Sequence, residues 1–210
     1  MPIWLADFPP GVIGNAGVRL CATAGRELHP APKIKHKYTN KLKVVKLFVI
    51  RYNGFVLKEK KLLEILTQKK LTLSIAESCT GGLLSNRLTN IPGSSRAFLL
   101  GIISYSNSSK NKILKIPEKI IQAQGAVSPQ TAKLMAVNAR KLAGSSLGIG
   151  ITGIAGPGGG NKFKPVGTIY IAVASGKKTG VRKFNFSGNR LQIKRRTTDK
   201  AIDMLLEVIK

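Results

Sequence analysis

One short segment of the chain combines several side chains that can act as nucleophiles. It is Glu77-Ser78-Cys79-Thr80-Gly81-Gly82, which follows an apolar stretch and precedes a helical pattern. A helix start offers unpaired N–H groups to an oxyanion or a phosphate, and glycines let a substrate approach closely. We expect Ser78 to be the nucleophile of a small hydrolase, with Cys79 and Thr80 as alternatives. We expect the substrate to contact Glu77, Thr80, Gly81 and Gly82. A capping serine and two packing glycines without catalytic role would show the same pattern.

A serine hydroxyl needs a base, and Tyr105-Ser106-Asn107-Ser108-Ser109-Lys110 supplies a candidate. This segment follows the second predicted strand, so we expect it at the same edge of the sheet as Ser78. Both histidines, His29 and His36, lie in an irregular part of the chain, which leaves a desolvated lysine as the available base type. Lys110 is therefore the candidate base. The alternative is that it is one more surface lysine among 35 basic residues.

A glycine-rich segment ends the third predicted strand, and its backbone amides could surround a phosphate or a ring. It matches neither a Walker loop nor a dinucleotide fingerprint. The candidate substrate-binding residues in it are Thr152, Gly153, Gly156, Gly158 and Gly159. The alternative is a flexible connection with no ligand.

The last predicted helix opens with Ser187-Gly188-Asn189-Arg190. An arginine at this place can hold a phosphate through two parallel hydrogen bonds, so Arg190 is a further substrate-binding candidate. The alternative is a capped helix start followed by an exposed arginine.

Hydrophobic patterning from residue 58 onward predicts an α/β domain with a mixed sheet of about five strands. The predicted strands cover residues 71–76, 97–105, 147–152, 166–174 and 181–186, and the last two are expected to form a hairpin. The predicted helices lie around 62–66 and at 81–91, 108–114, 117–124, 129–143 and 190–209. The run over 97–105 is unbroken and apolar, so we expect burial on both faces.

Residues 1–57 contain repeated Pro and Gly breaks, six lysines between residues 33 and 46, and one predicted strand, Val44–Ile50. We therefore expect an irregular basic extension before a domain over 58–210. Neither a transmembrane helix nor a metal-ligand spacing is present, and Cys21 and Cys79 cannot make a disulfide framework. A cytoplasmic protein without cofactor or membrane partner is expected.

The formal net charge is +26, with 14 basic and 4 acidic residues over 1–70 and 21 and 5 over 71–210. A basic surface attracts nucleic acids and anionic metabolites. No nucleic-acid motif accompanies the charge, so we expect solvated lysines rather than a nucleic-acid site.

Taken together, these segments resemble the C-terminal domain of the CinA (competence/damage-inducible) protein family over residues 58–210. The matching segments are Ala76–Gly82, Tyr105-Ser106-Asn107 with Lys110, Gly125–Ser128, Thr152–Gly159, Pro165–Thr168 and Gly188–Arg190. The chain departs from the family's usual Gly-Asp-Arg at Gly188-Asn189-Arg190. A carboxylate that could orient Arg190 is therefore missing.

The resemblance implies a three-layer α/β/α sandwich and a stand-alone nicotinamide mononucleotide amidohydrolase (deamidase). Such an enzyme releases ammonia and leaves nicotinate mononucleotide in pyridine nucleotide recycling, a branch of NAD metabolism. It needs no metal, and because relatives of this kind often pair, a homodimer is one expectation for this chain. We expect Ser78 to attack the carboxamide, Lys110 to take its proton, Tyr105 to relay a proton to ammonia, and N–H groups near Thr80 and Gly81 to hold the oxyanion. Two alternatives stay open: a binding or adaptor protein linked to competence or DNA damage, and a nucleotide-binding domain whose site has decayed.

Overall fold

The computed structural model describes residues 58–210, and at its centre is a five-stranded mixed sheet. The strands are β1 (Leu73–Glu77), β2 (Phe98–Ile103), β3 (Leu147–Gly153), β4 (Thr168–Ser175) and β5 (Lys178–Asn185). Their order is β2-β1-β3-β4-β5, in which β1 pairs in parallel with β2 and β3, while β4 and β5 run antiparallel. The predicted mixed sheet and its hairpin are confirmed. The predictions for residues 1–57, including the strand over Val44–Ile50, lie outside the described residues.

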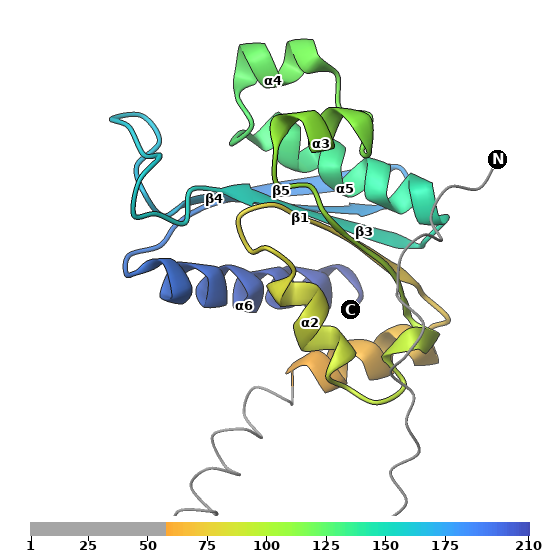
Figure 1. Cartoon of the computed structure of the whole chain (residues 1–210). Helices are drawn as coiled ribbons and strands as arrows, with labels where there is room; N and C mark the ends of the chain where they lie inside the picture. The colour runs from red at the N-terminus through yellow and green to blue at the C-terminus, as the bar shows by residue number, and fades with distance from the viewer. Residues whose placement is uncertain (1–57) are drawn as a thin grey trace, which may run out of the picture. The chain divides into compact units, whose positions relative to one another are not determined.

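Helices cover both faces of this sheet, which makes the fold a three-layer α/β/α sandwich as expected (Figure 1). One layer holds α3 (Asn107–Lys112), α4 (Glu118–Gln124) and α5 (Pro129–Ala143). The other holds α2 (Leu83–Thr89), α6 (Arg190–Val208) and a helix over residues 58–68. The three central strands β1, β3 and β4 are thereby shielded from water on both faces.

The close approach of α5 to the sheet depends on two glycines of β3. A Cβ atom on Gly148 or Gly150 would collide with the backbone carbonyl oxygens of Ala136 and Ala132. The neighbouring positions Ile149 and Ile151 are fully buried on the opposite side of the same strand. Small and large residues therefore alternate along β3, so that the helix lies directly on the backbone of one face and a packed core fills the other.

Strand β2 is the one element whose burial was predicted wrongly. Among the described strands it lies at the edge of the sheet and pairs with β1 alone, and its residues alternate between half-buried and exposed. Leu99 and Ile103 are 47% and 53% exposed. The apolar run over 97–105 therefore does not indicate burial on both faces, because an edge strand with a bulge beside Leu73 leaves part of it open.

The helix ends follow the local sequence closely. The hydroxyl of Ser128 accepts a hydrogen bond from the Thr131 amide ahead of Pro129, and α5 stops at Gly144 in the left-handed conformation. At the start of α6, Asn189 and Gln192 form a reciprocal capping box. Asn189 therefore caps the helix without the family's usual aspartate.

Candidate functional site

Loops from three neighbouring strands and the start of α6 meet at one edge of the sheet. The β1–α2 turn carries Ser78, the segment after β2 carries Tyr105 and Lys110, the β3–β4 loop carries Gly156, and α6 begins with Arg190. The carboxyl ends of the parallel strands β1, β2 and β3 all point to this edge (Figure 1). This is the position at which open α/β sheets bind ligands.

The central contact of the site joins Ser78 to Lys110. Lys110 Nζ lies 3.0 Å from Ser78 Oγ, although the residues are 32 positions apart in the chain. Ser78 is 8% exposed and Lys110 is 1% exposed. The interpretation of Lys110 as a surface lysine is therefore wrong, and the contact between the two side chains is buried.

Lys110 is held by oxygen atoms that carry no formal charge. Its Nζ also donates to the carbonyl oxygens of Ser104, at 2.8 Å, and Tyr105, at 3.1 Å. No carboxylate of the described residues forms an ion pair with it. Burial therefore lowers the pKa of the Lys110 amine, because an ammonium loses hydration here without gaining a counter-ion.

The Glu77 side chain is turned into the protein, away from where a substrate was expected to contact it. It is fully buried, and its Oε2 accepts hydrogen bonds from the amides of Gly82 and Leu84. Its Oε1 accepts from both the amide and the hydroxyl of Ser85. Glu77 thus caps the first turn of α2 and fixes the turn that carries Ser78.

The rival nucleophile Cys79 is packed into the apolar core. Its side chain is 6% exposed and belongs to the same buried cluster as Ile75 and Leu84. Burial raises the pKa of the Cys79 thiol to about 12. A thiol with such a pKa holds almost no thiolate near neutral pH, so Cys79 is chemically inert compared with a reactive cysteine.

The two glycines after Thr80 take backbone conformations that side chains disfavour. Gly81 and Gly82 have φ values of +61° and +89°, in the left-handed region. The Gly81 amide donates to the Ser78 carbonyl oxygen at 3.1 Å, and the Gly82 amide donates to Glu77. Neither is available to an oxyanion. Thr80 is fully buried, and no described contact engages its amide or its hydroxyl.

Arg190 connects two segments that the sequence separates widely. Its Nη1 donates to the Gly156 carbonyl oxygen at 2.7 Å, and its Nη2 donates to the Tyr105 hydroxyl at 2.8 Å. These two oxygens orient Arg190 in place of the missing aspartate. The Tyr105 ring is 58% exposed, and among the described residues its hydroxyl contacts Arg190 rather than Ser78 or Lys110.

The glycine-rich segment divides into a part that packs and a part that projects from the sheet (Figure 1). The Thr152 hydroxyl donates to the Ala126 carbonyl oxygen at 2.7 Å, and a Cβ on Gly153 would lie 2.7 Å from the Thr168 carbonyl oxygen. The Thr152 hydrogen bond therefore holds the end of β3 in place, and Gly153 allows the close packing there. Gly158 and Gly159 are exposed. The loop contacts the site through the Gly156 carbonyl oxygen, which accepts the hydrogen bond from Arg190.

Lys194 reaches the site although the sequence did not single it out. A Cβ on Gly81 would lie 3.6 Å from Lys194 Nζ, so the ammonium sits over the turn that carries Ser78. Lys194 is one helical turn beyond Arg190 on α6, and side chains four positions apart share a helix face. That spacing was the available signal, but it was masked by the many other lysines of the chain.

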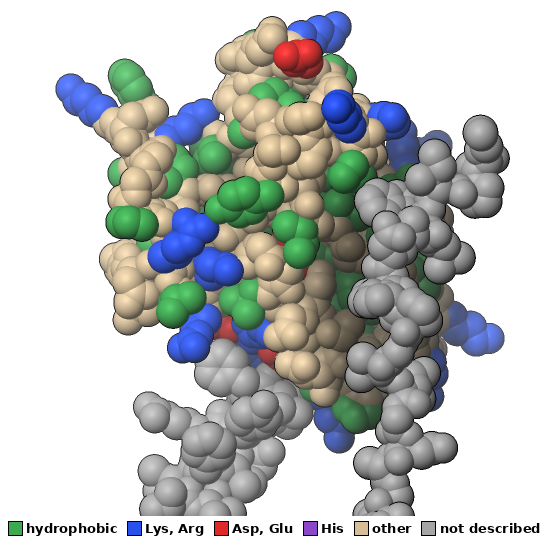
Figure 2. Space-filling model, viewed as in Figure 1, with side chains coloured by type: hydrophobic (Ala, Val, Ile, Leu, Met, Phe, Trp, Pro, Cys, Tyr) green, Lys and Arg blue, Asp and Glu red, His purple; other side chains and the backbone are tan. Residues whose placement is uncertain are grey.

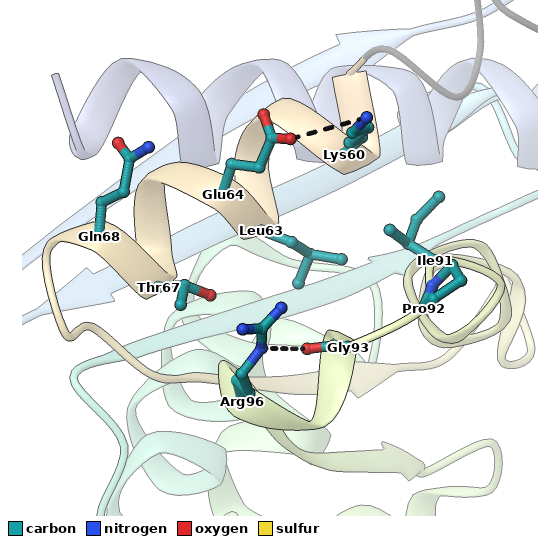
Figure 3. A pocket seen from close by; sticks show the side chains of 9 residues that line it. All are labelled: Lys60, Leu63, Glu64, Thr67, Gln68, Ile91, Pro92, Gly93 and Arg96. Atoms are coloured by element: carbon teal, nitrogen blue, oxygen red, sulfur yellow. Dashed lines mark hydrogen bonds and ion pairs between the residues drawn. The ribbon is translucent and has the colours of Figure 1, made fainter.

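A separate groove of about 330 Å³ lies between the helix over residues 58–68 and the segment over residues 91–96 (Figure 3). Its lining residues are Lys60, Leu63, Glu64, Thr67, Gln68, Ile91, Pro92, Gly93 and Arg96. Two of its charged side chains are paired, because Lys60 lies 3.8 Å from Glu64. None of these residues belongs to the site described above.

Within residues 58–210, no group of three or more His, Cys, Asp or Glu side chains is placed to hold a metal ion. None of the described helices is both long and apolar enough to cross a bilayer.

The fold and the buried serine–lysine contact define an α/β domain with a polar site at the carboxyl edge of its sheet. The sequence profile of the CinA C-terminal domain matches residues 57–209. The chain therefore belongs to the CinA C-terminal domain family, as the sequence motifs predicted.

Named relatives support the same membership. A putative competence-damage inducible protein of Caldicellulosiruptor bescii is 48% identical over 151 residues, which are 72% of this chain and 37% of that protein. A CinA-like protein of Geotalea uraniireducens is 44% identical over 161 residues, 74% of this chain and 38% of the relative. The chain thus spans little more than a third of the length of these relatives.

Solved structures match almost over their whole length. The competence/damage inducible protein CihA from Agrobacterium tumefaciens superimposes with a TM-score of 0.73 at 33% identity, covering 74% of this chain and 96% of that one. A CinA superfamily protein from Enterobacter cloacae gives a TM-score of 0.72 at 31% identity, covering 74% and 92%.

Proposed function

We propose that this domain is a nicotinamide mononucleotide amidohydrolase that forms an acyl-enzyme on Ser78. The observation that carries the proposal is the 3.0 Å contact between Ser78 Oγ and the almost fully buried Lys110 Nζ. A lysine kept out of water and away from carboxylates is suited to serve as a base for a serine. The choice of substrate rests on membership of the CinA family and on the motifs that the chain shares with it.

The hydrogen bonds around Lys110 suit a neutral amine. Two N–H groups of the amine donate to the carbonyl oxygens of Ser104 and Tyr105, which leaves the nitrogen lone pair for the proton of Ser78. As Ser78 Oγ bonds to the carboxamide carbon, its proton moves to Lys110 Nζ. General-base assistance of this kind contributes about a hundredfold to ten-thousandfold in rate.

The negative charge that forms on the carboxamide oxygen needs donors that are not already in use. The amides of Gly81 and Gly82 donate to Ser78 and Glu77, so we assign this role to Thr80. Its amide and its hydroxyl have no partner among the described residues, and both lie two positions from the nucleophile. Donors fixed in a dry site stabilise an oxyanion without having to reorganise.

Collapse of the intermediate expels ammonia and is followed by hydrolysis of the ester. The proton on Lys110 passes to the carboxamide nitrogen, with Tyr105 relaying it, as the carbon–nitrogen bond breaks. The Tyr105 oxygen accepts a hydrogen bond from Arg190, so its own proton is directed elsewhere and is free to donate. Water then gives a proton to Lys110 and its oxygen to the acyl carbon, and Ser78 leaves with the proton restored. The products are nicotinate mononucleotide and ammonia.

Ammonia release from nicotinamide mononucleotide tests this proposal, with the wild type and Ser78→Ala measured side by side. Ser78→Ala removes one hydroxyl, and Lys110 keeps the carbonyl oxygens of Ser104 and Tyr105 as partners, so we expect the variant to fold, which thermal unfolding checks. Activity in the wild type alone is the expected result. Equal ammonia release by the two folded proteins would exclude Ser78 as the nucleophile. No release by either, together with salt-sensitive DNA binding, would favour the adaptor alternative, whose support is the net charge of +26.

A further inference from the structure

The start of α6 concentrates positive charge beside the Ser78 turn. Residues 190–196 include Arg190, Lys194, Arg195 and Arg196, and no acidic residue occupies the first turn of the helix. Figure 2, viewed as Figure 1, shows Lys and Arg side chains on the left of the molecule, where α6 begins. Cations at a helix start oppose the helix dipole, and like charges four positions apart repel each other.

The charge on Lys194 is not neutralised by the fold. Lys194 is half-buried, and it takes part in none of the ion pairs or side-chain hydrogen bonds of the described residues. Its neighbour Arg196 is tied instead to the carbonyl oxygen of Ser187. The carboxylate of Glu77, which precedes the Ser78 turn, accepts hydrogen bonds from amides at the start of α2 instead of pairing with Lys194. Positive charges at a helix start that destabilise the helix, and that no acidic side chain of the fold neutralises, indicate a functional site.

We propose that Lys194, with Arg190 one helical turn before it, binds the phosphate monoester of the substrate and makes the enzyme selective for a nucleotide over its nucleoside. The proposal rests on the amidohydrolase function proposed above. Lys194 supplies a mobile point charge, while Arg190 is held by Tyr105 and Gly156 and keeps its remaining N–H groups for the same anion. Gly81 has no side chain to fill the space over the turn. A Cβ atom placed there would lie 3.6 Å from Lys194 Nζ.

Inorganic phosphate is the first probe, because its binding needs no catalysis. Thermal unfolding is followed in increasing phosphate, with sodium chloride at equal ionic strength as reference. A ligand that binds the folded state raises the melting temperature in proportion to its occupancy. The variants are Lys194→Gln and, as matched control, Arg195→Gln, which removes the same charge from an exposed neighbour on the same helix. We expect the stabilisation to be lost in Lys194→Gln and kept in Arg195→Gln, and Lys194→Arg to restore part of it.

Kinetics with two substrates then assign the anion site to the substrate. We expect Lys194→Gln to raise KM for nicotinamide mononucleotide about tenfold to a hundredfold, the loss typical of a hydrogen bond to a charged group, with little change in kcat. KM for nicotinamide riboside, which lacks the phosphate, should not change. Phosphate binding by Lys194→Gln equal to that of the wild type would overturn the proposal. The two proposals can also fail separately. If the wild type binds phosphate but releases no ammonia, and Lys194→Gln loses the phosphate binding, the anion site is supported and the amidohydrolase function is refuted.

Discussion

Replacement of Glu77 tests whether this buried carboxylate positions the Ser78 turn or contacts the substrate. In Glu77→Ala, the amides of Gly82, Leu84 and Ser85 and the hydroxyl of Ser85 all lose their acceptor. A hydrogen bond to a charged group contributes about 1.5–3 kcal/mol, and such contributions are not additive around one carboxylate. Water can reach the half-buried amides of Gly82 and Ser85, so we expect a total loss of about 3–5 kcal/mol.

The milder variant Glu77→Gln separates geometry from charge. Its carbonyl oxygen can still accept from the Gly82 and Leu84 amides, but its NH₂ group would face the Ser85 amide, another donor. We expect a loss of about 1.5–3 kcal/mol, which for a domain of this size lowers the melting temperature by roughly 3–12 °C. The matched control is Glu118→Gln, an exposed carboxylate in the first turn of α4, for which we expect less than about 0.5 kcal/mol.

Thermal unfolding followed by circular dichroism measures the stability, and ammonia release at a temperature where both variants are folded measures function. A positioning residue should lower kcat by displacing Ser78 and leave KM near its wild-type value. Unchanged stability together with a strongly raised KM would refute the positioning role and return Glu77 to the substrate-binding residues that the sequence suggested.

Two further predictions concern the ionisation of groups near Ser78. Because only the neutral amine can accept the serine proton, kcat/KM should rise with pH through the pKa of Lys110, with a midpoint below the value of about 10.4 for an exposed lysine; Lys110→Met should remove this rise and lower kcat about a hundredfold or more. A midpoint at or above that value would contradict the effect of burial. Cys79→Ala should keep most of the activity, and the wild-type thiol should react with iodoacetamide far more slowly than free cysteine, because its pKa is about 12. Rapid alkylation with loss of activity in the folded protein would show that Cys79 is a reactive group.

The sequence predicted most of the helices and strands because their signals are local. Ser128 before Pro129 and Gly144 after Ala143 set the two ends of α5, and the apolar stretches gave all five strands. The burial of β2 could not be predicted in this way. An apolar run looks the same in a central strand and in an edge strand, and it is the order of the described strands that places β2 at the edge, beside β1.

The sequence by itself also determined which residues meet at the site, because the segments after parallel strands share one edge of the sheet. Ser78, Lys110, Tyr105 and Arg190 all follow from that rule together with the family motifs. What each side chain does there was decided by the tertiary structure alone. Glu77 turns inward because the α2 amides need an acceptor, Lys110 loses its hydration because helices and strands enclose it, and Lys194 reaches Gly81 from the far end of the chain. Burial and contacts between distant segments depend on the packing of the whole domain, and no local pattern of residues encodes them.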